Sequence, residues 1–307
     1  MGEIAFVFSG QGTQYSGMGK DLYENSPAAK EVFDLADAFR PGTAAQCFGG
    51  TQEELSQTIN TQPCVFCVDL AAAQCLKAER ILPRAVAGFS LGEVAALTFA
   101  GAFGMDAGFR FVCKRAAFMQ EAAEKHPSGM AAVLKLPVET VRELCGRHEY
   151  TYPVNYNCKG QTVVALPKSA LGDFCKEAQA AGGRAVPLAV SGGFHSPFMD
   201  DAAQKLRTEL RTEEIRPTSL PVYSNVTAKP YGEEMKATIA NQVNHPVYWQ
   251  KSVENMIADG IDTFIEVGPG KTLCGLIKKI SSQVRILHVE NFAEAQAVVE
   301  EVRRSPC

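Results

Sequence analysis

Apolar runs alternate with segments of helical periodicity through the first third of the chain. The run from Ile4 to Phe8 is apolar at every position, which is typical of a strand buried on both faces of a sheet. Other segments space their apolar residues three and four positions apart, as amphipathic helices do. This alternation predicts a parallel sheet with helices on both faces. The pattern predicts a strand over 4–8, helices over 28–39, 53–59 and 62–76 (with Pro63 at the start of the last), a strand over 81–87, and helices over 93–100 and 106–124.

The order of elements changes near His126. A strand, a helix, two strands, a helix and a strand follow, and this β-α-β-β-α-β order is that of a ferredoxin-like unit. The segment has about seventy residues, which is within the size range of a small domain. The predicted strands cover 130–136, 152–157, 162–166 and 185–190, and the predicted helices cover 138–146 and 171–181.

The first pattern returns after Phe198. It predicts a helix over 200–210, a strand over 222–226, a helix over 251–258, a strand over 263–267, a helix ending at 276 and a strand over 286–289. We therefore predict an α/β fold with a hydrolase-like parallel-sheet core and an inserted ferredoxin-like small subdomain. The predicted boundaries are 1–127 and 197–307 for the large subdomain and 128–196 for the small one.

Composition and charge narrow the classes of protein. The 307 residues are 46% hydrophobic and 21% charged, as in ordinary globular proteins. The net charge of −4 gives no overall basic field, so we expect no nucleic-acid partner. No apolar run has the length of a membrane span, so we expect no membrane partner. The chain opens on a strand pattern without a signal peptide, which predicts a cytoplasmic protein.

Ten cysteines are scattered along the chain without the spacings of a disulfide framework. Cys64 and Cys67 form a CxxC, but no second CxxC and no histidine pair accompanies them. They lie in an apolar, helix-like run. We therefore predict two buried thiols there, and no metal site.

Gly88-Phe89-Ser90-Leu91-Gly92 is a G-x-S-x-G motif between a predicted strand and a predicted helix. A serine on such a sharp turn projects its hydroxyl away from the backbone. Glycines there permit positive φ angles and close packing. Ser90 is therefore a candidate nucleophile. A glycine-rich turn that carries an ordinary serine is an equally good interpretation of the local sequence.

A serine nucleophile needs a general base, and the chain has five histidines. His195 is the best candidate, because it lies where the small subdomain returns the chain to the large one, a common location for sites. A loop histidine that is simply hydrogen-bonded is the commoner case for such a residue. His148 lies in a charged loop and is expected to be solvated. No Asp or Glu adjoins His195, so a backbone carbonyl is a candidate partner for its Nδ1–H.

Nearly the whole chain carries motifs in a fixed order. They are Phe6-Val7-Phe8-Ser9-Gly10-Gln11-Gly12, Thr61-Gln62-Pro63, Gly88-Phe89-Ser90-Leu91-Gly92-Glu93, Lys114-Arg115, Phe118-Met119-Gln120, Asn155-Tyr156-Asn157, Gly160-Gln161, Phe194-His195-Ser196-Pro197, Ser224-Asn225-Val226-Thr227, Pro246-Val247-Tyr248-Trp249 and Glu266-Val267-Gly268-Pro269-Gly270. With these motifs the chain resembles the malonyl-CoA:acyl carrier protein transacylase (malonyltransferase) family. That family's fold and reaction are what the resemblance implies for this chain.

The resemblance implies a ping-pong transfer of malonyl from malonyl-CoA to the phosphopantetheine thiol of acyl carrier protein. The reaction is expected to need no metal and no other cofactor. We expect the protein to be a monomer. Ser90 is expected to carry the malonyl ester and His195 to act as its base. The backbone N–H groups of Gln11 and Leu91 are expected to donate to the oxyanion, and Arg115 is expected to bind the malonyl carboxylate. Gln62 is expected to line the substrate pocket, and Gln161 to help position the substrate.

Some alternatives stay open. Phe89 stands where the family usually has histidine, which can change the polarity of the pocket. An acyl-thioester hydrolase with the same motif is the second hypothesis, although a buried arginine contributes little to general hydrolysis. A carrier-protein docking module with an inactive site is the third. Fatty-acid and polyketide roles are not distinguished. Docking of an acidic carrier protein needs basic residues, and the candidates are Lys114, Lys271, Lys278 and Lys279.

Overall fold

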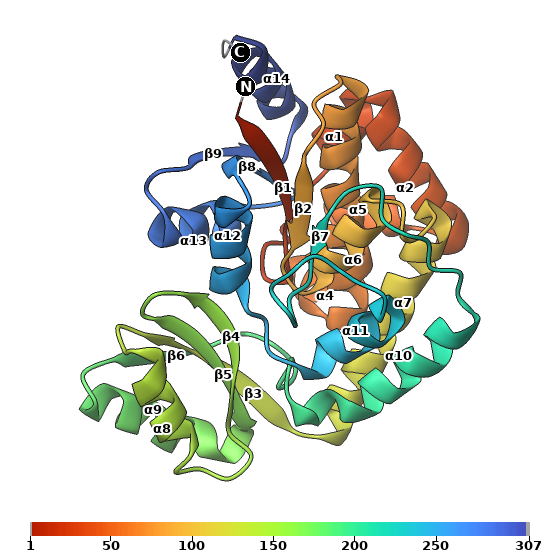
Figure 1. The fold of residues 1–307 in the computed structure, drawn as a ribbon. Coiled ribbons are helices and arrows are strands. Elements are labelled where there is room, and N and C mark those ends of the chain that lie inside the picture. The colour runs from red at the N-terminus through yellow and green to blue at the C-terminus, as the bar shows by residue number, and fades with distance from the viewer. Residues whose placement is uncertain (1, 305–307) are drawn as a thin grey trace.

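The computed structural model describes residues 2–304 and contains two sheets, one parallel and one antiparallel (Figure 1). Residues 305–307, at the end of the predicted large subdomain, lie outside the described residues. The larger sheet has the strand order β7-β2-β1-β8-β9, and every neighbouring pair is parallel. Its strands are β1 (Glu3–Phe8), β2 (Ala85–Gly88), β7 (Val222–Tyr223), β8 (Ile261–Val267) and β9 (Arg285–Val289).

Helices cover both faces of this sheet (Figure 1). The side chains of Phe6 and Phe8 pack with one group of helices, and those of Ala5 and Val7 pack with the other. This two-sided burial explains why β1 is apolar without alternation. The first group contains α2 (Pro27–Phe39), α5 (Thr58–Ala78), α6 (Leu91–Phe99) and α7 (Met105–Lys125), and the second contains α12 (Trp249–Ala258) and α13 (Thr272–Ile280).

The small sheet lies beside the large one and has the order β4-β5-β3-β6, with every pair antiparallel. One face packs against two helices in a core of its own, and the other contributes Met130 and Val163 to the main core. The order of elements confirms the predicted ferredoxin-like unit, while its exact boundaries remain a prediction. The elements are β3 (Ser128–Leu134), α8 (Val138–Cys145), β4 (Tyr152–Cys158), β5 (Gln161–Pro167), α9 (Leu171–Ala180) and β6 (Arg184–Pro187).

A backbone bridge joins the two parts. Val247 belongs to the segment before α12, yet its N–H donates to the carbonyl of Val154 at 2.8 Å and its carbonyl accepts from Tyr156 at 2.9 Å. The segment therefore extends the small sheet at the edge of β4. This connection holds the small subdomain in place over the carboxyl ends of the parallel strands, where sites in such sheets occur.

The structure corrects some predicted bounds. The helix predicted from residue 62 begins at Thr58, so Pro63 lies inside α5 and not at its start. A proline there removes a helix hydrogen bond, at a cost of about 3 kcal/mol. Burial of α5 on most of its surface offsets this cost. The helix predicted over 53–59 is interrupted at Gln57, which has an extended backbone.

Other elements were not predicted or are shorter than expected. The strand predicted over 222–226 has only two residues, and β6 ends at Pro187 instead of residue 190. Four helices were not predicted: α1, α3, α11 and α14. The remaining elements are α1 (Lys20–Asn25), α3 (Thr43–Gly49), α4 (Gln52–Ser56), α10 (Asp200–Thr212), α11 (Met235–Asn241), α14 (Phe292–Arg304) and the 3₁₀ turns Lys168–Ala170, Pro197–Met199 and Gln242–Asn244.

Between residues 2 and 304, no helix combines the length and the apolar character that crossing a membrane requires.

Candidate active site

Ser90 lies on a sharp turn between β2 and α6. Its φ of 55° and ψ of −107° are rarely adopted by a residue with a side chain. Such a conformation costs roughly 1–3 kcal/mol and persists only where its surroundings enforce it. The turn leaves the Ser90 side chain partly exposed at the carboxyl end of the parallel sheet.

The two glycines of the motif are required by packing and not by positive φ, which corrects part of the expectation. A Cβ on Gly88 would lie 2.0 Å from the carbonyl of Gly92, and a Cβ on Gly92 would lie 2.3 Å from the carbonyl oxygen of Phe8. Both distances are far shorter than any normal contact. The strand and the helix can therefore approach closely enough to form the turn only if neither position has a side chain.

His195 is buried, and both of its ring nitrogens have partners beside Ser90. Its Nδ1 lies 2.8 Å from the backbone carbonyl of Gln242, and its Nε2 lies 2.7 Å from Ser90 Oγ. A carbonyl oxygen only accepts, so Nδ1 carries the proton and Nε2 accepts from the serine hydroxyl. This is the tautomer that a general base for Ser90 requires. The expected backbone-carbonyl partner is thus supplied by Gln242.

Arg115 is 1% exposed, and its guanidinium reaches the same hydroxyl. Nη1 donates to Gln62 Oε1 at 2.7 Å. Nη2 donates to Gln242 Oε1 at 2.8 Å and to Ser90 Oγ at 3.1 Å. These acceptors are all neutral, so the site contains a buried cation that no carboxylate contacts directly. Such a site has a strong affinity for an anionic group.

Burial and this cation set the electrostatics of the base. Burial, followed by the charge of Arg115, lowers the pKa of His195 to about 4. Burial also lowers the pKa of Arg115 to about 10, so the guanidinium stays charged near neutral pH. The site at rest therefore holds a neutral imidazole and a charged guanidinium on either side of one hydroxyl.

Two polar side chains that the sequence did not mark as site residues hold the turn in place. Asn225 Oδ1 accepts from the Ser90 N–H at 2.8 Å, and its Nδ2 donates to the carbonyl of Gly88 at 2.7 Å. Gln242 Nε2 donates to the carbonyl of Ser90 at 2.6 Å. Asn225 had two usable signals, because it is a polar residue two positions after a buried strand and belongs to one of the quoted motifs. Gln242 had none, since it lies in an unremarkable polar stretch.

Two of the other predicted site residues, Gln11 and Gln161, lie on a cavity of about 220 Å³ beside the serine turn, whereas Gln62 contacts Arg115 instead. Gln11, Phe89 and Gln161 all line it, together with residues of β4 and β5. The ring of Phe89 also packs against Trp249 with 5.5 Å between ring centres. Leu91 is the first residue of α6, so its N–H has no acceptor within the helix. Three larger surface hollows, of about 530, 560 and 810 Å³, contain none of these residues.

His148 does not have the solvated environment that its charged loop predicts. Its side chain is 17% exposed and packs against Phe174. Its Nε2 lies 3.1 Å from Glu177. His148 therefore belongs to the small subdomain's own packing and not to the site.

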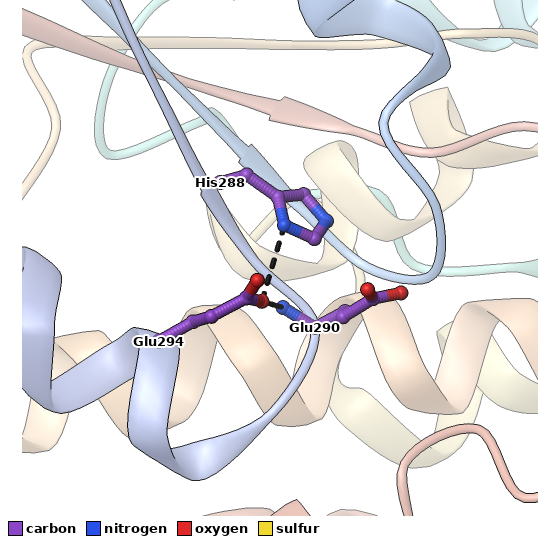
Figure 2. Close-up of side chains that lie close together, drawn as sticks. All are labelled: His288, Glu290 and Glu294. Atoms are coloured by element: carbon purple, nitrogen blue, oxygen red, sulfur yellow. Dashed lines mark hydrogen bonds and ion pairs between the residues drawn. The ribbon is translucent and has the colours of Figure 1, made fainter.

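Among residues 2–304, one group of three side chains has the types and spacing to hold a metal ion, and Figure 2 shows it: His288, Glu290 and Glu294. Its carboxylates already have partners within the protein. Glu294 lies 3.1 Å from His288 Nδ1 and 3.0 Å from Lys271 Nζ. Glu290 accepts from the Gly270 N–H at 2.9 Å. These contacts fasten the start of α14 to a neighbouring turn, and the Lys271 ammonium competes with any cation there.

Comparison with known proteins identifies the family. Residues 5–303 match the acyl transferase domain family. The chain is 37% identical to the malonyl CoA-acyl carrier protein transacylase of Bacillus subtilis (strain 168), over 99% of this chain and 98% of the relative. It is also 37% identical to the malonyl CoA-acyl carrier protein transacylase of Escherichia coli (strain K12), over 91% of this chain and 93% of the relative.

Solved structures superimpose on nearly the whole of this chain. The malonyl CoA-acyl carrier protein transacylase of Clostridium perfringens superimposes with a TM-score of 0.94 and 36% identity, over 98% of this chain and 97% of that one. A type II PKS malonyl-transacylase in complex with its acyl-carrier protein superimposes with a TM-score of 0.92 and 32% identity, over 97% and 99%. These findings confirm the resemblance seen in the sequence. The chain belongs to the acyl transferase domain family and, within it, to the malonyl CoA-acyl carrier protein transacylases.

Proposed function

We propose that this protein transfers malonyl from malonyl-CoA to the phosphopantetheine thiol of acyl carrier protein through a malonyl ester on Ser90. Family membership makes it an acyltransferase. The observation that carries the assignment to malonyl is the buried guanidinium of Arg115, 3.1 Å from Ser90 Oγ. Malonyl has a free carboxylate that acetyl lacks, and a fork-shaped cation binds a carboxylate through two hydrogen bonds.

In the first half-reaction, Ser90 Oγ attacks the thioester carbonyl of malonyl-CoA while His195 Nε2 takes the hydroxyl proton. The negative charge that develops on the carbonyl oxygen is stabilised by the backbone N–H groups of Gln11 and Leu91, and one such donor is typically worth about 3–4 kcal/mol. The carbon–sulfur bond then breaks. The CoA thiol leaves with the proton from His195, and the malonyl ester stays on Ser90.

The second half-reaction reverses these steps with a different thiol. The phosphopantetheine thiol gives its proton to His195 and attacks the ester carbonyl. The bond between carbon and Ser90 Oγ breaks, and the serine recovers its proton from the imidazolium. The cavity of about 220 Å³ lined by Gln11, Phe89 and Gln161 is the proposed channel for the pantetheine arm.

Incubation of the protein with holo acyl carrier protein and malonyl-, methylmalonyl- or acetyl-CoA tests this assignment. Mass spectrometry of the carrier protein is expected to show malonyl as the main acyl group. Release of free malonate without loaded carrier protein would instead indicate a hydrolase. Loading of acetyl at an equal rate would contradict the assignment to malonyl.

The low pKa of His195 predicts an unusual pH dependence. Only the neutral imidazole accepts the serine proton, and its pKa is lowered to about 4. The acylation rate should therefore fall by about tenfold per pH unit only below about pH 4, and not below the ordinary histidine value of about 6.5. Rapid mixing with malonyl-CoA and measurement of released CoA thiol gives the profile. A loss of tenfold per pH unit that begins near pH 6.5 and continues to pH 4 without a plateau would contradict the assigned environment.

The structure narrows the candidate docking residues for the acidic carrier protein. Lys114 pairs with Glu209, and Lys271 pairs with Glu294. Lys278 and Lys279 are exposed in the last turn of α13 and have no ion pair within the described chain. Lys279 Nζ also donates to Gln161 Oε1 at 3.2 Å, which places it next to a residue that lines the cavity. We propose that these two lysines contact the carrier protein.

Charge reversal at Lys279 tests the docking proposal. Lys279→Glu should raise the KM for carrier protein by about 3- to 10-fold, because it replaces an attraction at the rim with a repulsion. Acylation by malonyl-CoA alone should not change. The matched control is Lys176→Glu on α9, where the lysine is exposed and pairs with Asp173. An equal loss in both half-reactions would assign Lys279 to CoA instead of the carrier protein.

A further inference from the structure

Glu93 is a buried carboxylate one turn away from the serine. It is 1% exposed and occupies the third position of α6. A glutamate at this position usually bonds back to the start of its own helix. Glu93 instead reaches a distant loop, where Oε2 accepts from the Asn225 N–H at 2.5 Å and Oε1 accepts from the Tyr231 hydroxyl.

Asn225 connects Glu93 to the strained turn. While its backbone N–H is held by Glu93, its side chain bonds to both sides of Ser90, at the Ser90 N–H and at the carbonyl of Gly88. The positive φ of Ser90 needs such external support. The bonds therefore run in series from the Glu93 carboxylate through Asn225 to the backbone that presents Ser90 Oγ and the Leu91 N–H.

Glu93 also bears on the charge of the site. Arg115 has only neutral hydrogen-bond acceptors, and Glu93 is the acidic group whose charge acts on it most strongly. The groups that face Glu93 are Arg115 from α7, Tyr231 and Asn225 from the loop after β7, and Gln242 from the turn before α12. Burial raises the pKa of Glu93 to about 7, so its charge changes near neutral pH.

We propose that Glu93 is a positioning residue for acyl transfer: its carboxylate holds the Ser90 turn through Asn225 and balances the buried charge of Arg115. The proposal rests on the proposed function and goes beyond it. When Glu93 is ionised, its bond to Asn225 is charge-assisted, and its negative charge opposes the effect of Arg115 on His195. When Glu93 is protonated, the bond weakens and His195 becomes a poorer base. Acylation should therefore rise as Glu93 ionises.

The series Glu93→Gln and Glu93→Ala separates the two effects. Glutamine keeps an oxygen for the Asn225 N–H and can donate to the Tyr231 hydroxyl, so it removes only the charge. We expect kcat for acylation to fall by about 3- to 10-fold in Glu93→Gln and further in Glu93→Ala, with the KM for malonyl-CoA not raised in Glu93→Gln. Glu121→Gln is the matched control, because Glu121 is an exposed glutamate that pairs with Lys205.

If Glu93 had a purely structural role, its replacement would not change how the acylation rate depends on pH. The pH profile therefore tests the proposed role. Wild type should show a shallow rise in acylation rate centred near pH 7, and Glu93→Gln should lack it. Tyr231→Phe removes a hydrogen bond that lowers the pKa of Glu93, so it should move the rise to higher pH. If Glu93→Gln does not fold, the shift of this rise in Tyr231→Phe tests the inference by itself.

Two results would overturn the inference. One is a Glu93→Gln profile that superimposes on the wild-type profile with an unchanged kcat. The other is an unshifted rise in Tyr231→Phe. Failure of the proposed function is distinguishable from both, because wild type itself would then load no malonyl onto carrier protein.

Discussion

Replacement of Ser90 with alanine is expected to abolish the malonyl-enzyme and to slow transfer to carrier protein by on the order of 10⁴- to 10⁶-fold, as loss of the nucleophile does in serine enzymes. The reason is geometric. Ser90 Oγ lies 2.7 Å from the proposed base and 3.1 Å from the proposed anchor, so the reaction has no other hydroxyl in this position. The measurement is mass spectrometry of the intact protein after brief exposure to malonyl-CoA.

Ser191→Ala is the matched control for this experiment. Ser191 is an exposed serine four positions before His195, and its hydroxyl lies 3.0 Å from Thr58 Oγ1 and not at the base. It should leave acylation intact. A malonyl adduct that persists on Ser90→Ala would exclude Ser90 as the nucleophile. Rapid hydrolysis of the wild-type ester without transfer to carrier protein would keep Ser90 as the nucleophile and favour the hydrolase alternative.

The large sheet was the most predictable part of the fold. A strand such as β1 is buried on both faces, and an unbroken apolar run identifies it without knowledge of its neighbours. Short helices such as α1 and α3 have six and seven residues, too few for a periodic pattern to stand out. A different limit applies to the 21-residue α5: it is buried on most sides, which obscures its periodicity, and its start was misplaced at Pro63.

The serine turn was predictable because its signal is local. Five consecutive residues between a strand and a helix indicate the turn, although the sequence suggested positive φ for the glycines where the structure has it at Ser90. His195 and Arg115 are different, because they lie 105 and 25 positions from Ser90. The place of His195 at the subdomain junction made it the candidate base, but only the resemblance to a family placed Arg115 in the site. The structure brings them together, and their catalytic roles remain predictions.

The bonds by which Asn225 and Gln242 support Ser90 could not be predicted from periodicity or from the motifs. Their bonds to Ser90 span 135 and 152 positions, and each joins a side chain to a backbone group. A backbone donor or acceptor leaves no trace in the sequence, so no pairing of residue types points to it. The support of a strained turn becomes visible only when the fold places the loop after β7 and the turn before α12 around it.

Replacement of Arg115 with alanine is expected to lower kcat/KM for malonyl-CoA by about 10²- to 10⁴-fold, since charge-assisted hydrogen bonds contribute about 1.5–3 kcal/mol each and a carboxylate accepts two. Gln62 and Gln242 hold the guanidinium from either side, so its fork is oriented before substrate binds. The Nη2 bond to Ser90 Oγ is the one that a bound carboxylate can displace. Acetyl-CoA has no such group, and its transfer should not fall with that of malonyl-CoA.

Acetyl transfer should even improve, because Arg115 has a second effect on the site. Its charge helps to lower the pKa of His195, so its removal should make the imidazole a stronger base. Arg115→Lys keeps the charge but lacks the fork-shaped guanidinium. Its kcat/KM for malonyl-CoA should therefore lie between the values for wild type and Arg115→Ala. Lys114→Ala is the control, since Lys114 is the preceding residue of α7 and pairs with Glu209 at the surface. The measurement is the ratio of kcat/KM for malonyl-CoA and acetyl-CoA with one carrier protein. Equal losses for both acyl groups would show that Arg115 supports the site without selecting the malonyl carboxylate.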